Sequence, residues 1–326
     1  MKAFVTGATG FVGSHLVDKL IEMGIEPYCL KRKTSNIRWL KDKPVKFVDG
    51  DLFSNEALED VIKDMDYVFH CAGVVKAKNK EGYIKGNHLA TKNLVEITKK
   101  VNPNIKKFVH ISSLAVCGPT PKGVAIDETY EPKPMTSYAE TKLEAEKEVM
   151  KHKDEMNVTI IRPPAVYGPR DTEILIYFQT FKKGLNSLIG FGDKYLTLSY
   201  VKELVDGIVL AAEKDASNGQ IYFIGSDKAY NWDEVGVITS NILNKKSLKI
   251  RIPHFFVFGV GYMAEFFGKI ANKAVTLNVE KVKDITAEGW VCSSEKAKRE
   301  LGYNPIVTLE EGFRETAEWY TKEGWL

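Results

Sequence analysis

The sequence predicts an α/β protein built on a doubly wound parallel sheet. The first observation is a short apolar run at Lys2–Thr6, which leads through a glycine-rich turn at 7–13 into a helical pattern at Ser14–Ile21. The second observation is that strand-like runs alternate with helical patterns along the first third of the chain. Such alternation is typical of parallel sheets, whose binding sites lie at the carboxyl ends of the strands.

The glycine-rich turn is the strongest signal for a function. A turn of this kind between a strand and a helix lets a diphosphate approach the backbone, and the helix N-terminus offers unpaired N–H groups. The turn therefore predicts a dinucleotide site, with a purely structural turn as the alternative. The expected cofactor contacts here are Gly7, Thr9, Gly10, Phe11, Val12 and Gly13. A Walker-type loop is excluded because no Gly-Lys-Ser/Thr follows.

The remaining elements of the first half follow in order. We expect strands at Glu26–Leu30, Val45–Val48, Tyr67–Gly73 and Phe108–Ser113, and helices at Asn55–Lys63 and Tyr83–Lys100. The small or polar residues at the strand ends should border the cofactor. These further contacts are Asp51, Leu52, Cys71, Ala72, Gly73 and Ser112.

The end of the second strand favours NADP, with NAD as a possible alternative. NAD-binding sites of this type carry an Asp or Glu at this point, which accepts hydrogen bonds from the adenine ribose. The chain instead has the basic run Lys31-Arg32-Lys33, followed by Ser35. Arg32 is suited to bind a 2′-phosphate and Ser35 to donate a hydrogen bond to it. The alternative is a solvated basic loop.

Tyr138 and Lys142 form the expected catalytic pair. They stand four residues apart in a helix that we expect at Tyr138–His152, with Ser137 as its cap, so they share one helix face. A free tyrosine has a pKa of ~10. We expect the lysine ammonium and a nicotinamide cation to lower it. The alternative is a surface pair without catalytic function.

At this point the chain resembles the extended short-chain dehydrogenases/reductases. The motifs that carry the resemblance are Thr6-Gly7-x-x-Gly10-x-x-Gly13, Asp51-Leu52, Ser112-Ser113, Tyr138-x-x-x-Lys142, Arg162–Pro169 and Lys296–Pro305. The resemblance implies a Rossmann fold in which Ser113 polarises the substrate oxygen, Tyr138 transfers the proton and Lys142 also holds the nicotinamide ribose. It also implies that Pro163, Ala165 and Val166 pass beside the nicotinamide.

Within that family the chain looks like the dihydroflavonol reductase and 3β-hydroxysteroid dehydrogenase branch. Sugar-nucleotide epimerases of the family usually carry an arginine before a strand–helix junction, and the comparable stretch 193–203 has none. The family's frequent tyrosine after the Ser-Ser motif is Cys117 here. We therefore expect an oxidoreductase that moves a hydride between NADP and a carbonyl or secondary alcohol of a small, fairly apolar molecule. The alternatives are a nucleotide-sugar epimerase or dehydratase with tightly bound NAD(P), and a non-catalytic binding protein.

The second half should complete the sheet and build a smaller substrate-binding lobe. We expect strands at Val158–Arg162 and Gln220–Ile224, a helix at Tyr200–Lys214, and a final helix that starts with a capping box at Thr308. The expected Rossmann domain is 1–170 with 197–225, and the expected substrate-binding lobe is 171–196 with 226–326. The apolar stretch 252–263 is expected to form a buried lid helix, with a membrane-surface contact or an apolar substrate wall as alternatives.

Composition sets the remaining expectations. The chain has 326 residues and a net charge of +3, which does not favour nucleic acid as a partner. Its six histidines and four widely spaced cysteines show no metal-ligand spacing, so we expect no metal. With no signal peptide before the first strand, we expect a cytoplasmic protein. The partners that we expect are a small-molecule substrate and a second copy of the chain, paired through the helices near 83–100 and 138–152.

Overall fold

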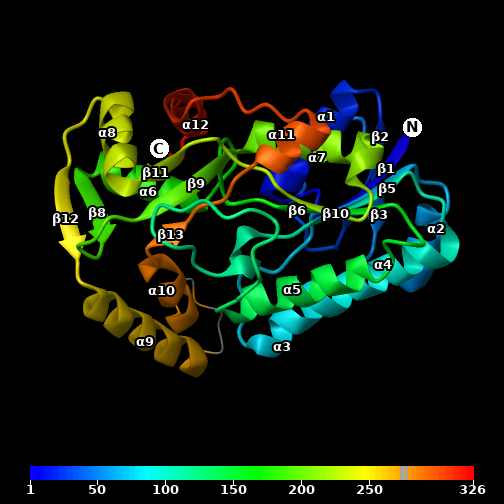
Figure 1. Ribbon diagram of the computed structural model, residues 1–326, viewed down its shortest axis with the longest axis horizontal. Coiled ribbons are helices and arrows are strands. Elements are labelled where there is room, and N and C mark those ends of the chain that lie inside the picture. The colour runs from blue at the N-terminus through cyan, green and yellow to red at the C-terminus, as the bar shows by residue number, and fades with distance from the viewer. Residues whose placement is uncertain (272–274, 276–277) are drawn as a thin grey trace.

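The computed structural model describes residues 1–271, 275 and 278–326, and its larger part is a seven-stranded parallel sheet (Figure 1). The strand order is β10-β6-β5-β4-β1-β2-β3. The strands are β1 (Lys2–Thr6), β2 (Glu26–Lys31), β3 (Lys46–Asp49), β4 (Tyr67–His70), β5 (Lys107–Ile111), β6 (Val158–Arg162) and β10 (Gln220–Phe223). Each neighbouring pair is parallel, so the carboxyl ends of all seven strands share one edge.

Helices cover both faces of this sheet. One face packs on α1 (Phe11–Glu22), α7 (Val201–Glu213) and α11 (Glu295–Leu301), whose apolar residues share a core cluster with strand residues. The other face packs on α2 (Asn55–Ile62), α4 (Ala90–Val101) and α5 (Ser137–Met150). The predicted doubly wound parallel sheet is therefore confirmed.

Two predicted helices differ from the structure in detail. The helix expected at Tyr83–Lys100 begins earlier, at α3 (Lys80–Tyr83), and continues through a π-helical segment, η1 (Ile84–Leu89), into α4. The expected cap of α5 was wrong. Thr136, not Ser137, is the N-cap residue, and its side chain accepts a hydrogen bond from the Ala139 N–H at 3.2 Å.

The smaller lobe contains two further sheets. In the first, β9 (Tyr195–Tyr200) pairs with β7 (Ala165–Tyr167), β11 (Ala229–Asn231) and β13 (Gly289–Trp290). In the second, β8 (Leu185–Ile189) pairs with β12 (Leu248–Ile252). The helices of this part are α6 (Glu173–Lys182), α8 (Trp232–Leu243), α9 (His254–Ile270), α10 (Val279–Thr286) and α12 (Leu309–Lys322); the 3-10 turns η2 (Leu114–Cys117) and η3 (Asp215–Ser217) lie outside it. The capping box predicted at Thr308 is confirmed at the start of α12.

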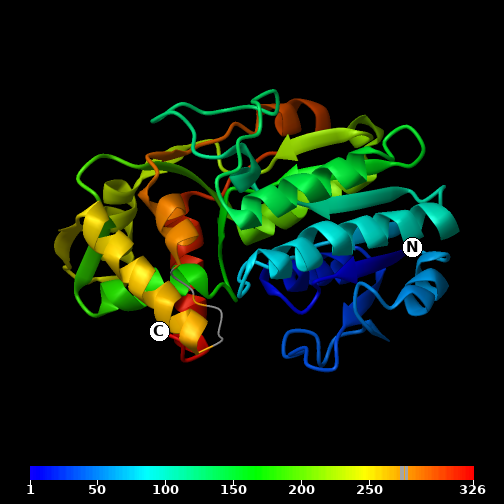
Figure 2. The same cartoon turned by 90° about the horizontal axis from the view of Figure 1, so that it is seen from below.

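Helix α9 corrects a prediction. The apolar stretch at 252–263 was expected to be a buried lid helix, but most of its large side chains are exposed. In Figure 1 and Figure 2 the helix lies on the outside of the molecule and packs mainly on α10. Its 17 residues are too few to span a bilayer, and no other helix of the described residues is both long and apolar enough to do so.

Candidate active site

The glycine-rich turn joins the carboxyl end of β1 to α1 and lies against the end of β4. Gly7 has a φ of +70°, and a Cβ atom on it would lie 2.7 Å from the backbone of Cys71 and Ala72. A Cβ on Gly13 would collide with the Gly7 carbonyl oxygen. Only glycine therefore lets this turn pass so close to β4 and to its own helix.

The N-terminus of α1 is suited to hold a negatively charged group. Its N-cap residue is Gly10, which provides no side-chain hydrogen bond to the first turn, and that turn contains no acidic residue. Among the residues that the structure describes, the N–H groups of Phe11 and Val12 have no partner, and they add to the positive end of the helix dipole. These residues fit a dinucleotide diphosphate, as the sequence predicted. Thr9 lies in the same turn.

The segment after β4 is held open by an asparagine that the sequence analysis missed. Asn87 is buried in η1, and its Oδ1 accepts a hydrogen bond from the Val74 N–H at 2.7 Å. Its Nδ2 donates to the Val74 carbonyl and to Thr141 Oγ1 of α5. Asn87 thereby ties the Ala72–Gly73 segment to the helix that carries Tyr138. No local signal in the sequence marks this residue, because its role depends on its burial and its contacts.

Ser113, Tyr138 and Lys142 meet at the carboxyl end of β5. Ser113 caps η2, and its Oγ accepts a hydrogen bond from the Ala115 N–H at 3.1 Å. The same hydroxyl lies close enough to Tyr138 to influence its pKa. Lys142 is almost fully buried, and its Nζ donates to the Ile111 carbonyl oxygen at 2.5 Å. The geometry therefore brings together the three residues of the predicted catalytic set.

The pKa of Tyr138 differs from the prediction. Burial raises it to about 12, and the Asp284 carboxylate acts in the same direction, whereas the nearby Ser113 hydroxyl lowers it. Burial also lowers the pKa of Lys142 to about 8. The surroundings that the protein provides thus favour the neutral phenol, opposite to the lowered pKa that we expected.

Two buried histidines lie behind Lys142. His110 Nε2 is 3.4 Å from Lys142 Nζ, and the His70 and His110 rings are 5.2 Å apart. His70 contacts Thr6 Oγ1 at 2.7 Å and Thr91 Oγ1 at 2.8 Å. Burial, reinforced by the Lys142 charge, lowers the pKa of His70 to about 3 and that of His110 well below its ordinary value. Both rings are therefore neutral at physiological pH.

The end of β2 carries exposed cations, among them Arg32. Lys31 pairs with Asp49, and the Arg32 side chain is exposed, with no side-chain partner among the described residues. Ser35 Oγ accepts a hydrogen bond from the Arg32 N–H at 3.0 Å, which fixes the turn. Asp51 is also exposed, and its Oδ1 accepts from the Phe53 N–H at 2.8 Å. This geometry leaves Arg32 available to an anion.

The remaining predicted contacts lie at the ends of neighbouring strands. The chain leaves the large sheet after Arg162 and joins the smaller sheet at Ala165, so Pro163 lies where the two parts meet, followed by Val166 in β7. Ser112 is buried at the end of β5, and its Oγ has no hydrogen-bond partner among the described residues. Leu52 follows β3, and its carbonyl accepts from Asn93 Nδ2 at 2.7 Å.

Helix α10 of the smaller lobe lies against this site. The Glu280 carboxylate accepts hydrogen bonds from the Ser137 N–H at 3.1 Å and the Ser137 hydroxyl at 2.7 Å, immediately before Tyr138. Asp284, one turn further along α10, acts electrostatically on Tyr138. The smaller lobe therefore supplies a wall next to the catalytic set.

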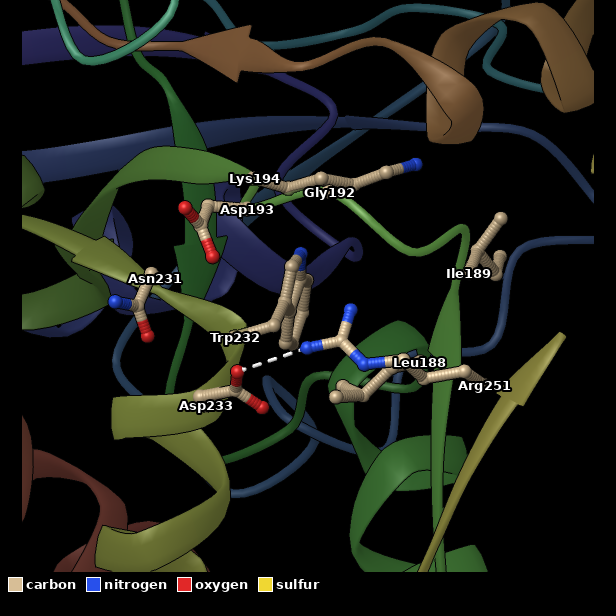
Figure 3. Close-up of a pocket in the computed structure, with 9 residues that line it drawn as sticks. All are labelled: Leu188, Ile189, Gly192, Asp193, Lys194, Asn231, Trp232, Asp233 and Arg251. Atoms are coloured by element: carbon tan, nitrogen blue, oxygen red, sulfur yellow. Dashed lines mark hydrogen bonds and ion pairs between the residues drawn. The ribbon is translucent and has the colours of Figure 1, made fainter. Parts of the chain in front are cut away.

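A separate small hollow lies elsewhere in the smaller lobe, between β8, β12 and the start of α8 (Figure 3). Asp233 forms ion pairs there with Arg251 at 3.1 Å and Lys249 at 2.6 Å. Its lining includes none of the predicted site residues. We assign it no part in the active site.

Comparison with known proteins agrees with this geometry. The profile of the NAD dependent epimerase/dehydratase family matches residues 3–225. Sterol-4-alpha-carboxylate 3-dehydrogenase, decarboxylating, from Bos taurus is 31% identical, over 96% of this chain and 90% of the relative. Ceramide reductase from Caulobacter vibrioides is 26% identical, over 99% of this chain and 95% of the relative.

Solved structures share the fold. The UDP-glucuronic acid 4-epimerase from Bacillus cereus, in complex with UDP-glucuronic acid and NAD, superposes with a TM-score of 0.80. It covers 99% of this chain and 100% of the epimerase, at 24% sequence identity. At that identity the likeness concerns the architecture alone.

Proposed function

The chain belongs to the NAD-dependent epimerase/dehydratase family, and from this premise we propose that it is an NADP-dependent oxidoreductase of the extended short-chain type. It moves a hydride between the nicotinamide and a carbonyl or secondary alcohol of a small, fairly apolar molecule. The observation that carries the proposal is that Ser113, Tyr138 and Lys142 converge at the carboxyl end of β5, where Lys142 Nζ donates to the Ile111 carbonyl oxygen and Ser113 influences the pKa of Tyr138. A pure binding protein needs no such aligned proton donor.

The chain's own residues supply binding and the proton. A bound nicotinamide dinucleotide supplies or accepts the hydride. The N-terminus of α1 and the glycine-rich turn hold the diphosphate, and Arg32 with Ser35 holds the 2′-phosphate. In the reducing direction Tyr138 gives its proton to the oxygen of the substrate, and Ser113 donates a hydrogen bond to the same oxygen. Lys142 holds the ribose next to the nicotinamide.

The substrate assignment rests on the sequence relatives. The sterol dehydrogenase and the ceramide reductase are named for lipid substrates, which supports an apolar alcohol or ketone as substrate. We assign its binding to the lobe formed by 171–196 and 226–326, and the cofactor to 1–170 with 197–225. The part of α10 next to Tyr138 supports this division.

The cysteines support an assignment of the cellular compartment. The four cysteines are free thiols, and three of them are buried, which supports the reducing cytoplasm as the compartment.

We also propose a homodimer formed through α4 and α5. These helices lie side by side on one face of the sheet, which supports the pairing.

Deuterium transfer distinguishes the oxidoreductase from its alternative. The purified protein is incubated with NADPH deuterated at C4 and a panel of apolar ketones, and product and cofactor are analysed by mass spectrometry. We expect loss of NADPH absorbance and one deuterium in each product molecule. Tyr138→Phe should lower turnover by at least 10²-fold while leaving NADPH binding nearly unchanged.

An epimerase or dehydratase would give a different result. It would retain tightly bound cofactor through purification and show no net consumption of added NADPH. That outcome, or turnover of Tyr138→Phe equal to wild type, would refute the proposal.

A further inference from the structure

We propose that α9 is a membrane-surface helix whose outward face lies in the headgroup region of a lipid bilayer that contains anionic lipids. The inference begins with the two faces of this helix. Eight large apolar side chains of α9 are exposed, with exposed fractions of 40–77%: Phe255, Phe256, Val260, Tyr262, Met263, Phe266, Phe267 and Ile270. At about 100° per residue they fall within an arc of roughly 160°.

The opposite face is made of small residues. Gly261 and Gly268 are buried, as is Val257, which is 6% exposed. A Cβ atom on Gly261 would lie 2.7 Å from Val282 Cγ2, so this glycine allows α9 to pack closely on α10. A helix on the surface of a water-soluble protein buries its apolar stripe and exposes polar residues. Helix α9 instead exposes its large apolar residues and buries glycines and Val257.

The exposed patch is large for a protein surface in water. A fully exposed aromatic side chain offers about 200 Å². Because the five rings of α9 have exposed fractions of 59–77%, together they present on the order of 600 Å². The largest apolar patch of a typical monomer is about 300–600 Å², and patches at this limit mark interaction sites. The three aliphatic side chains enlarge the patch further. The patch therefore needs an apolar partner.

The length of α9 and its surrounding charge favour a bilayer surface as that partner. The helix is too short to cross a bilayer, so it must lie along the surface. The segment from Lys245 to Asp284 contains eight Lys or Arg and three Asp or Glu, whereas the whole chain contains 46 and 43. Two of the eight, Lys249 and Arg251, pair with Asp233 outside the segment, which leaves six basic and three acidic residues. The net positive charge of the protein is therefore concentrated around α9, which complements anionic headgroups.

The same charge argues against a second copy of the chain as the partner. In a two-fold symmetric contact the same surface occurs on both sides, so the basic segments of the two chains would face each other. Like charges across an interface oppose association. A bilayer with anionic lipids satisfies both the apolar face and the positive charge.

The location of α9 places a bound bilayer near the catalytic set. Helix α9 packs on α10, and Glu280 of α10 bonds to Ser137 immediately before Tyr138. A bilayer bound to α9 therefore lies beside the lobe that borders the catalytic set. The membrane contact itself does not depend on the proposed reaction, and its test below measures binding alone.

The test is flotation of the full chain with vesicles on a density gradient. We expect the wild-type protein to float with vesicles of phosphatidylcholine and phosphatidylglycerol, and less with phosphatidylcholine alone. Raising the salt concentration should remove only the difference between the two lipids. The variant F255S/F266S/F267S should lower the bound fraction at least tenfold.

The matched control is V237S/I306S. These two side chains are 61% and 75% exposed, and they lie in α8 and in the loop before α12, so this variant should float like the wild type. Equal melting temperatures show that all variants are folded. Wild-type protein that stays in the lipid-free fractions, or a triple variant that floats like wild type, would overturn the proposal. So would a lipid-free mass of two chains that falls to one in the triple variant, since the face would then be a protein interface.

Discussion

The protonation of Tyr138 determines the direction in which the catalytic set works most readily. Because burial raises the pKa of this phenol to about 12, it carries its proton throughout the physiological range. A protonated phenol next to the Ser113 hydroxyl is a general acid that needs no prior activation. In the proposed mechanism this protonated phenol suits reduction of a carbonyl, whereas oxidation of an alcohol would first require removal of this proton.

A pH profile separates the roles of Tyr138 and Lys142. Since burial lowers the pKa of Lys142 to about 8, this side chain is positive below pH 8 and neutral above it. We expect kcat/KM for NADPH to fall as the pH rises through about 8, because kcat/KM reports the free enzyme. No inflection is expected between pH 6 and 7, since His70 and His110 stay neutral there. A profile that is level from pH 7 to 10 would contradict this assignment.

Arg32 should set the cofactor preference. A charge-assisted hydrogen bond contributes about 1.5–3 kcal/mol, which corresponds to roughly a ten- to hundredfold preference for NADP over NAD. We expect Arg32→Ala to weaken NADPH binding by that factor and to leave NADH binding nearly unchanged, as measured by fluorescence titration. Lys33→Ala is the matched control, because Lys33 is a neighbouring exposed cation. Equal affinity of the wild type for NADH and NADPH at low salt would refute the role of Arg32.

That Ser113, Tyr138 and Lys142 lie together could be predicted because their types and spacing are restrictive. A glycine turn before a helix and a Tyr-x-x-x-Lys pair after a Ser-ended strand leave few structural alternatives. Asn87 and the two histidines could not be found in this way. Their effect depends on burial and on contacts between β4, β5 and α5, which no local pattern encodes.

At the scale of elements, a buried ion pair ties α5 to β6. Arg162 donates to Glu146 through Nη2 at 2.6 Å and Nε at 2.9 Å, and each side chain is 3% exposed. This pair fixes the helix that carries Tyr138 against the strand that leads to Pro163. The two charges satisfy each other, so the loss of either one leaves the other buried without a partner.

Glu146→Gln should therefore destabilise the protein strongly. We expect the free energy of unfolding in urea to fall by about 3–5 kcal/mol, because the Arg162 charge stays buried and unpaired. The matched control on the same helix is Glu144→Gln, whose exposed pair with Lys147 should cost at most about 1 kcal/mol. A loss at Glu146 no larger than that at Glu144 would show that the pair has no structural role.

The strands and most helices could be predicted because their periodicity and their caps are local. Helix α9 shows what local patterns cannot predict. Its apolar composition predicts a buried helix, but composition alone does not say whether a helix packs inside a lobe or on its surface. That outcome depends on the glycines that α9 presents to α10, a contact with a neighbour that follows it in the sequence.

At the scale of the whole molecule, the question is whether two copies of the chain form a dimer. Helices α4 and α5 leave a face of the large sheet that is mostly charged, with Leu89 as a 43% exposed apolar side chain at the junction of η1 and α4. His88 lies 3.2 Å from Glu148 of α5, which joins the two helices beside it. A two-fold contact centred on Leu89 would bury this side chain within a polar rim, the usual anatomy of an interface.

Light scattering tests this contact. We expect the protein at micromolar concentration to have the mass of two chains, against 36.7 kDa for one. Leu89→Arg should shift the mass to one chain, because the contact would bring two arginines together across the two-fold axis. Val237→Arg, on the exposed face of α8, should leave the dimer intact. If the wild type already has the mass of one chain, α4 and α5 are a solvated surface, and the catalytic set of each chain acts alone.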